Sequence, residues 1–514
     1  MHLGLSGVLL LLPVQERGDM RRIFSVFLFL FLIPGIRSYA QEKLSNEMEV
    51  FHTISSHDIL EYASELTSEK YRGRLSGSPG YAAAAGYVAG LLREWGLKPA
   101  VNDTSYFQWF PNAYTKVLNP GKVMIHRGKE AGSARNRKLG FPEEYYPGSN
   151  SATGIVTGEV VYAGFGISAP ELGYDDYAGL DVKGKIVLLE SGTPYSRDDS
   201  VMLKWEPYSY HRYKFQHAME MGAAGLLYVG LTANPNTTWT DGFVYAHISE
   251  AIADDILSEK GLPYAGLKAG IAKKMKPGSF PLRRKVTIKA STRHFPHTNS
   301  CNVAGIIEGS DPVLKNEAII VGAHLDAIGH PGMLFPGALD NASGCADLLG
   351  AARALASLEV KPRRTVIFLF FGGEECGLYG STAYTQNPLW PKEKVHLMLN
   401  LDMVGNGTGF FLQGGLSSPE LLHHFTTGND SLIHRPMRAT ENRTSFGRSR
   451  TDGAVFQKAG YPMMNLWTSG TVKPVFYHQP LDNTDGLTPE IMEDAAKLLY
   501  LGILGIANDT CLKP

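Results

Sequence analysis

From about residue 291 onward, short apolar runs alternate along the chain with stretches of helical spacing. The apolar runs have the length and composition of buried strands, and they are NVAGIIEG, EAIIVGAH, TVIFLFFGG, VHLMLNLDM and PMMNLW. Residues 341–358, 418–427 and 488–508 are predicted as helices, and Thr488 and Pro489 suit the N-cap and first turn of the last one. This alternation predicts an α/β domain with a mainly parallel sheet.

Two further helices are predicted nearer the N-terminus. Residues 56–68 carry apolar side chains at helical spacing, and residues 81–95 are rich in alanine and leucine and end at Gly96, a common helix stop. Residues 138–281 have a different texture, with short strand-like segments bounded by glycine and polar turns. We therefore expect one domain from residues 41–137 and 291–514, and a β-rich insert at residues 138–290.

The first 40 residues have the pattern of a targeting segment. Arg21 and Arg22 precede an apolar run at residues 23–33, and Ser38-Tyr39-Ala40 places small residues before a cut. This pattern is typical of a secretory signal peptide at residues 1–40, with translation starting at Met1 or Met20. The apolar run is short for a membrane span. The sequence predicts a secreted or periplasmic protein with no integral membrane span in the mature chain.

Composition narrows the function classes. Of 514 residues, 44% are hydrophobic and 19% charged, and the formal net charge is −1, so a globular chain with a sizeable core is expected. Because no basic stripe is visible, a nucleic-acid partner has no support. The chain has four cysteines. Cys301 and Cys511 are the pair we expect if a disulfide forms, although sequence alone does not fix connectivity.

Candidate metal ligands follow the predicted strands. His324 ends one strand, Glu374 and Glu375 follow a second, Asp402 follows a third, and Asp340 precedes the helix at residues 341–358. Because ligands bind beyond the carboxyl ends of parallel strands, these groups should converge at one rim. Each residue alone has an ordinary structural explanation, as a cap or a solvated turn. Together, in apolar surroundings where bare carboxylates are costly, they predict a metal site.

Adjacent Glu374 and Glu375 suggest two different tasks. Neighbouring side chains in a turn point in different directions, so one carboxylate can bind a metal while the other takes a proton from water. A metal ion lowers the pKa of water and polarises a scissile carbonyl. Asp326 lies two residues after His324 and is predicted to orient that imidazole through its second ring nitrogen.

The motifs AHLDAIG, GALDNASG, FFGGEECGLYGS, LNLDMVG and FYHQPLD resemble those of the secreted bacterial double-zinc aminopeptidases. Their superfamily includes glutamate carboxypeptidase, glutaminyl cyclase and the transferrin receptor ectodomain. The resemblance runs from about residue 56 to the end and implies a mixed, mainly parallel sheet sandwiched by helices. The segments DDYAGLDVKGKIVLLESG and HAMEMGAAGLLYVG resemble a protease-associated (PA) domain, which usually shapes substrate access.

The resemblance implies roles for individual residues, including two zinc ions bridged by Asp340. His324 and Asp402 would complete one zinc site, and Glu375 and His478 the other. Glu374 would be the general base for a water that bridges the zinc ions, and Asp326 would support His324.

The same resemblance implies a role for Tyr477, a cis peptide bond after Asp340, and a departure from the family at Gly453. Tyr477 would either donate to the developing oxyanion or be a packed aromatic beside His478. A non-proline cis bond is expected after Asp340. Gly453 departs from the family, where many members carry a polar residue such as histidine, and this puts substrate specificity in doubt.

The leading hypothesis is an exported metallo-aminopeptidase acting on peptides. A carboxypeptidase or dipeptidase for acidic substrates would need clustered arginines, for which Arg443, Arg448 and Arg450 are candidates, although solvated surface charges explain them better. Glutaminyl cyclase activity is disfavoured by the PA insert. A non-enzymatic binding module should lack ligands, and none is missing. No G-x-S-x-G motif supports a serine hydrolase.

Overall fold

A computed structural model describes residues 46–127, 136–197, 200–442 and 450–512. The predicted signal peptide, including Met20, lies outside these residues. The chain divides into two units, Met1–Val50 and Phe51–Pro514. Of the first unit only residues 46–50 are described, and they are helical, so the account below concerns the second unit. Within the described ranges, no helix combines the length and apolar character needed to cross a membrane.

The described residues form a nine-stranded mixed sheet that contains all five predicted strands. Its members are β1 (Lys98–Pro99), β2 (Phe107–Pro111), β13 (Asn299–Ile307), β14 (Ala318–His324), β15 (Thr365–Phe371), β16 (Val395–Leu401), β17 (Gly409–Gln413), β18 (Met437–Thr440) and β19 (Met463–Ser469). Strands β15, β14, β16 and β19 are neighbours and run parallel. β13 and β17 join this parallel centre in the antiparallel direction.

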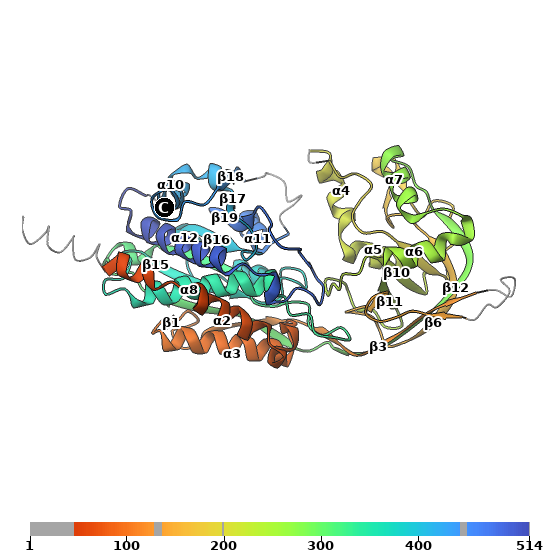
Figure 1. Ribbon diagram of the computed structural model, residues 1–514, viewed down its shortest axis with the longest axis horizontal. Coiled ribbons are helices and arrows are strands. Elements are labelled where there is room, and N and C mark those ends of the chain that lie inside the picture. The colour runs from red at the N-terminus through yellow and green to blue at the C-terminus, as the bar shows by residue number, and fades with distance from the viewer. Residues whose placement is uncertain (1–45, 128–135, 198–199, 443–449, 513–514) are drawn as a thin grey trace, which may run out of the picture. The chain divides into compact units, whose positions relative to one another are not determined.

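Helices cover both faces of this sheet. On one face α2 (Ser56–Thr67), α8 (Ser343–Ser357) and α12 (Pro489–Asn508) contact one another, and α3 (Pro79–Glu94) packs on β13 (Figure 1). On the other face α9 (Tyr379–Gln386) and α11 (Asp452–Lys458) place Tyr384 and Phe456 in the cluster of alternate β14 and β15 side chains. Because successive side chains of a strand point to opposite faces, each central strand packs against helices on both sides of the sheet. The predicted α/β sandwich is confirmed.

The predicted helices are confirmed to within two residues at each end, including α10 (Pro419–Gly428). The difference between predicted and observed helix ends that bears on the site is at the start of α8, next to Asp340. Helix α8 begins at Ser343, because Asp340 and Asn341 in the preceding turn, Ala338–Ala342, have non-helical backbone angles. A cis peptide bond joins Asp340 to Asn341, as the resemblance implies. Thr488 occupies the N-cap of α12, but its hydroxyl makes no capping bond.

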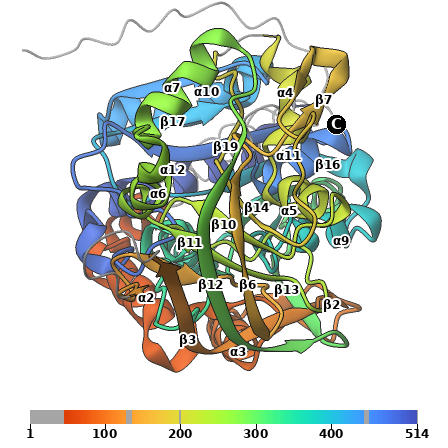
Figure 2. The ribbon, with the colours of Figure 1, turned by 90° about the vertical axis from the view of Figure 1, so that its right-hand side faces the viewer.

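A second, eight-stranded sheet in the described residues holds most of the predicted insert. Its strand order is β4 (Arg137–Lys138), β3 (Tyr114–His126), β12 (Phe280–Phe295), β6 (Gly154–Tyr162), β9 (Ile186–Leu189), β10 (Gly225–Val229), β11 (Val244–Ile248) and β5 (Tyr145–Pro147). Figure 2 shows β3, β6 and the long β12 side by side, which agrees with their antiparallel pairing.

This second sheet also has helices on both faces. Helix α5 (His211–Glu220) packs Phe215 and Ala218 on one face. Helices α6 (Glu250–Leu257) and α7 (Tyr264–Lys274) pack on the other, with Trp205 of α4 (Met202–Ser209). Helices α6 and α7 are not predicted from the strand-like texture of the sequence, and they make this region α/β.

The possible Cys301–Cys511 disulfide is wrong, since all four cysteines, each among the described residues, are free. Cys301 lies buried within β13, whereas Cys511 is exposed after the end of α12. Burial raises the pKa of the Cys301 thiol to about 12, so this residue is an inert apolar core residue.

Candidate metal centre

The site residues stand where three parallel strands end. His324 is the last residue of β14, Glu374 and Glu375 follow β15 after two glycines, and Asp402 follows β16. Because the strands are parallel, their carboxyl ends lie at one edge of the sheet. Asp340 joins them from the turn before α8. The segment between β19 and α12 supplies His478, whose backbone φ of 55° is in the left-handed region.

The first group consists of His324, Asp340 and Asp402. Nε2 of His324 lies 3.1 Å from Asp340 Oδ1 and 3.6 Å from Asp402 Oδ1. One ligand atom from each of the three residues lies within 4.8 Å of the others. This spacing suits three ligands of one metal ion.

The second group consists of His478, Glu375 and Asp340. Nε2 of His478 lies 3.0 Å from Glu375 Oε2 and 3.4 Å from Asp340 Oδ2. These ligand atoms also lie within 4.8 Å of one another. Asp340 therefore belongs to both groups and directs one carboxylate oxygen to each.

Burial and charge at the site fit a bound cation. His324 is 1% exposed and His478 5%. Neither His478 Nε2 nor Glu375 Oε1 has a hydrogen-bond partner among the residues that the structure describes. Burial lowers the pKa of His478, but Glu375 and Asp340 outweigh it and raise that pKa to about 10. The pKa of His324 is likewise well above its usual range, because Asp340 and Asp402 outweigh its burial. The carboxylates thus favour positive charge at both imidazoles, and a divalent cation would satisfy the orphaned atoms.

The residue predicted to support His324 does so differently from expectation. Nδ1 of His324 lies 3.1 Å from the backbone oxygen of Asp326, and 3.8 Å from its carboxylate. The buried carboxylate instead accepts hydrogen bonds from the backbone N–H groups of Glu374 at 3.1 Å and Glu375 at 3.2 Å. Asp326 therefore orients His324 through its main chain, while its side chain holds the Glu374–Glu375 turn.

Two further side chains hold the site and are not predicted from the sequence. Asp482 accepts hydrogen bonds from the backbone N–H groups of Leu339 at 2.8 Å and Asp340 at 3.2 Å. The guanidinium of Arg74, fully buried, donates to the backbone oxygens of Leu66, Leu325, Pro336 and Gly337. Asp482 belongs to the motif FYHQPLD and Arg74 to YRGRLSG. A charged residue inside each of these motifs is the signal that could have pointed to them.

Tyr477 lies at the border of the site. Its ring stacks on His478 with centroids 3.7 Å apart, and the residue is 48% exposed. The side chain is therefore accessible to a substrate and also packed on a ligand candidate. Its predicted role as an oxyanion donor stays a prediction.

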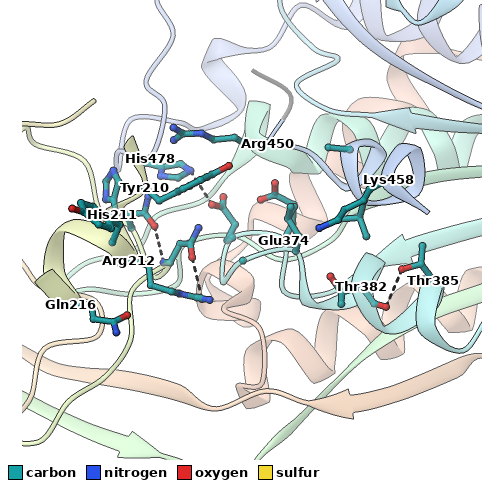
Figure 3. Close-up of a pocket in the computed structure, with 18 of the residues that line it drawn as sticks. Tyr210, His211, Arg212, Gln216, Glu374, Thr382, Thr385, Arg450, Lys458 and His478 are labelled. Carbon is teal, nitrogen blue, oxygen red and sulfur yellow. Dashed lines mark hydrogen bonds and ion pairs between the residues drawn. The ribbon is translucent and has the colours of Figure 1, made fainter. Parts of the chain in front are cut away.

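A pocket of about 800 Å³ opens beside the two groups. Figure 3 shows Glu374 between two walls, one formed by Tyr210, His211 and Arg212 and the other by residues of α9 and α11 such as Lys458. Arg450 also lines the pocket and donates to Ser209 Oγ at 2.5 Å. Arg443 and Arg448 lie outside the described residues.

Gly453 has a physical reason for its departure from the family pattern. A Cβ atom on Gly453 would lie 2.2 Å from Oδ1 of Asn465 and 3.0 Å from Sδ of Met463. Asn465 is fully buried and donates to Gln413. The space for a side chain at position 453 is therefore occupied by the side chains of Asn465 and Met463.

Comparisons with known proteins agree with this geometry. Residues 302–501 match the model of peptidase family M28, and residues 156–256 match that of the PA domain. An aminopeptidase of Pseudomonas aeruginosa is 26% identical over 472 residues, which cover 88% of this chain and 74% of the relative.

Two solved structures share the fold. The M28 peptidase precursor from Shewanella amazonensis SB2B has a TM-score of 0.64 at 19% identity, with 92% of this chain and 99% of that chain covered. BSAP, a zinc aminopeptidase from Bacillus subtilis, has a TM-score of 0.58 at 20% identity, with 90% and 97% covered. Residues 302–501 therefore resemble peptidase family M28, and residues 156–256 resemble the PA domain.

Proposed function

We propose that this protein is an exported aminopeptidase that removes N-terminal residues from peptides with the help of two zinc ions. The observation that carries this proposal is the shared Asp340, whose two oxygens face two separate ligand groups. The names of its relatives support an aminopeptidase, and one structural neighbour is a zinc enzyme. The secretory pattern of residues 1–40 supports export.

The ligand set fits zinc, because imidazole nitrogen and carboxylate oxygen are its usual ligands in catalytic sites. His324 and Asp402 would hold one ion, Glu375 and His478 the other, and Asp340 both. When bound there, zinc supplies a lowered pKa for water and polarisation of the scissile carbonyl.

Glu374 is proposed as the general base. It belongs to neither ligand group, yet it lines the pocket beside Glu375 and His478. Burial raises the pKa of its carboxyl, and Glu375 nearby adds to this effect. Glu374 would accept a proton from the attacking water and pass it to the leaving amine. Asp326 keeps the Glu374 backbone in place. Tyr477, which lines the same pocket, is proposed to donate to the developing oxyanion.

A carboxypeptidase or dipeptidase is the second candidate, and one observation favours it. Three basic side chains line the pocket, those of Arg212, Arg450 and Lys458. Among the described residues that line it, only Glu374 and Glu375 are acidic. This charge suits a substrate carboxylate.

One experiment separates these candidates. The mature chain from Gln41 is loaded with zinc and incubated with a short peptide that begins with Gln and ends with Glu, with and without chelator, and products are read by mass spectrometry. Chelator-sensitive loss of N-terminal residues is the expected result. Loss from the C-terminus would select the carboxypeptidase, and loss of ammonia alone a glutaminyl cyclase. Unchanged peptide in a zinc-loaded sample would contradict all three.

A further inference from the structure

Helix α5 of the PA domain reaches the turn that carries Glu374 and Glu375. Nη2 of Arg212 lies 3.2 Å from the backbone oxygen of Cys376, the residue directly after Glu375. The same nitrogen lies 3.1 Å from Tyr379 Oη and 3.3 Å from Asn236 Oδ1. One PA-domain guanidinium thus binds the main chain of the turn, a side chain of α9 and the loop after β10.

The turn approaches these PA residues so closely that a side chain at Gly377 would press against them. A Cβ atom on Gly377 would lie 3.0 Å from Arg212 Nη2 and 3.1 Å from Asn236 Oδ1, and its φ of +119° is in the region that favours glycine. Gly377 therefore allows the guanidinium to lie directly against the turn.

The turn is held from two directions. The Asp326 carboxylate binds the backbone N–H groups of Glu374 and Glu375 from the peptidase domain. Arg212 binds the following carbonyl from the PA domain. A second PA contact reaches the other side of the site, where the backbone N–H of Ala233 donates to the backbone oxygen of His478 at 3.1 Å.

We propose that Arg212 is a positioning residue that fixes the Glu374–Cys376 turn, so that the PA domain takes part in aligning the catalytic groups as well as shaping access. The inference rests on the proposed roles of Glu374 and Glu375. A planar guanidinium with several donors suits this task better than a lysine ammonium, which is a single point charge on a flexible stem. Partners that orient catalytic groups in this way typically contribute about 10- to 100-fold to activity.

The test is the kinetics of Arg212→Ala and Arg212→Lys in the full mature, zinc-loaded chain. We expect Arg212→Ala to lower kcat about 10- to 100-fold, with KM and zinc content little changed. Arg212→Lys should recover part of the loss, because it restores one cationic donor. Guanidinium ion at low millimolar concentration should partly rescue Arg212→Ala and leave the parent enzyme unaffected.

Arg137→Ala is the matched control. Arg137 lies in edge strand β4 of the eight-stranded sheet and pairs with Glu144 and Asp255. An equal loss of kcat in Arg137→Ala would show that general weakening of the PA domain is responsible and would overturn the proposal. A raised KM with unchanged kcat would assign Arg212 to substrate binding and would overturn it as well. If Arg212→Ala does not fold, full activity in Arg212→Lys decides against the proposal, and partial activity with normal KM supports it.

A failure of the proposed function can be distinguished from a failure of the role proposed for Arg212. A parent enzyme that is insensitive to chelator contradicts the metal mechanism regardless of Arg212. A chelator-sensitive parent with unchanged kcat in both Arg212 variants contradicts only the positioning role.

Discussion

Oδ2 of Asp326 accepts a hydrogen bond from the backbone N–H of Glu375 at 3.2 Å, across 49 positions of sequence. The other oxygen of Asp326 binds the Glu374 N–H. A fully buried carboxylate thereby fixes the proposed base and a proposed ligand through one turn. An alternative task, direct orientation of the His324 ring, falls to the Asp326 backbone oxygen.

The substitution Asp326→Asn is expected to lower kcat and zinc affinity, each by about 10- to 100-fold. An asparagine can accept only one of the two backbone hydrogen bonds, and its NH₂ group would face the other N–H. Steady-state kinetics and zinc titration measure the two effects. Asp311→Asn is the control for the loss of a charge that binds a turn, because Oδ1 of Asp311 alone accepts two backbone hydrogen bonds, from Val313 and Leu314, outside the metal centre. Equal losses in both variants would contradict a specific role.

Glu374→Gln should keep both zinc ions but lose about 10²- to 10⁴-fold in kcat, because the amide cannot accept the proton of the attacking water. The residue is part of neither ligand group, so metal analysis should give the parent's zinc content. Turnover near that of the parent would remove Glu374 from the role of base, and loss of zinc would make it a ligand.

Asp340→Ala and Asp402→Ala should differ in metal stoichiometry. Asp340 faces both His324 and His478, whereas Asp402 faces His324 alone. Elemental analysis after dialysis measures zinc content per chain. We therefore expect Asp340→Ala to lose zinc from both sites, and Asp402→Ala to keep the ion beside Glu375 and His478. Identical zinc content in the two variants would contradict the bridging role.

The central strands and the ligand candidates could be predicted because their signals are local. An apolar run followed by glycine and a carboxylate marks the end of β15 and the start of the Glu374–Glu375 turn within a dozen residues. Since β14, β15 and β16 are parallel, their end positions converge without any further information. The secondary structure of the insert is harder to predict from sequence. The apolar positions of α6 and α7 lie among strand-like segments, and apolar and polar residues do not alternate regularly along the whole of the long strand β12.

The contacts that hold the site could not be predicted, because each joins distant segments. Arg74 binds the backbone oxygen of Leu325, 251 positions away, and Asp482 binds the backbone of Leu339, 143 positions away. Neither backbone group has a sequence signature. The contact of Arg212 with Cys376 likewise depends on how two domains meet.

Gly453→Ala is expected to lower the free energy of unfolding by about 1–3 kcal/mol, because the new methyl group would overlap Asn465 Oδ1. Asn465→Ala should relieve the clash, so the double variant should be more stable than the sum of the single effects predicts. Urea unfolding of the four chains measures this coupling. Strictly additive effects would show that the turn around Gly453 moves away, and that Asn465 does not determine the residue at this position.

Lys214→Met is expected to change how stability depends on pH. Lys214 is fully buried in the PA domain and donates to the backbone oxygen of Phe165. Burial lowers the pKa of its ammonium to about 7 from 10.5, although Asp176 and Glu190 oppose this effect. Between these two pH values the unfolded chain holds a proton that the folded chain has released, so the parent gains stability as pH rises.

The variant lacks this titration, and its stability relative to the parent should therefore fall between pH 7 and pH 10. The total change is on the order of a few kcal/mol. Below pH 7 both states of the parent are protonated at this lysine, so the cost of the buried charge is constant there and the difference should level off. Urea unfolding at pH 6, 7, 8 and 9 gives the curve. A difference that stays flat from pH 7 to pH 9 would mean that Lys214 keeps its proton in the folded protein, held by Asp176 and Glu190.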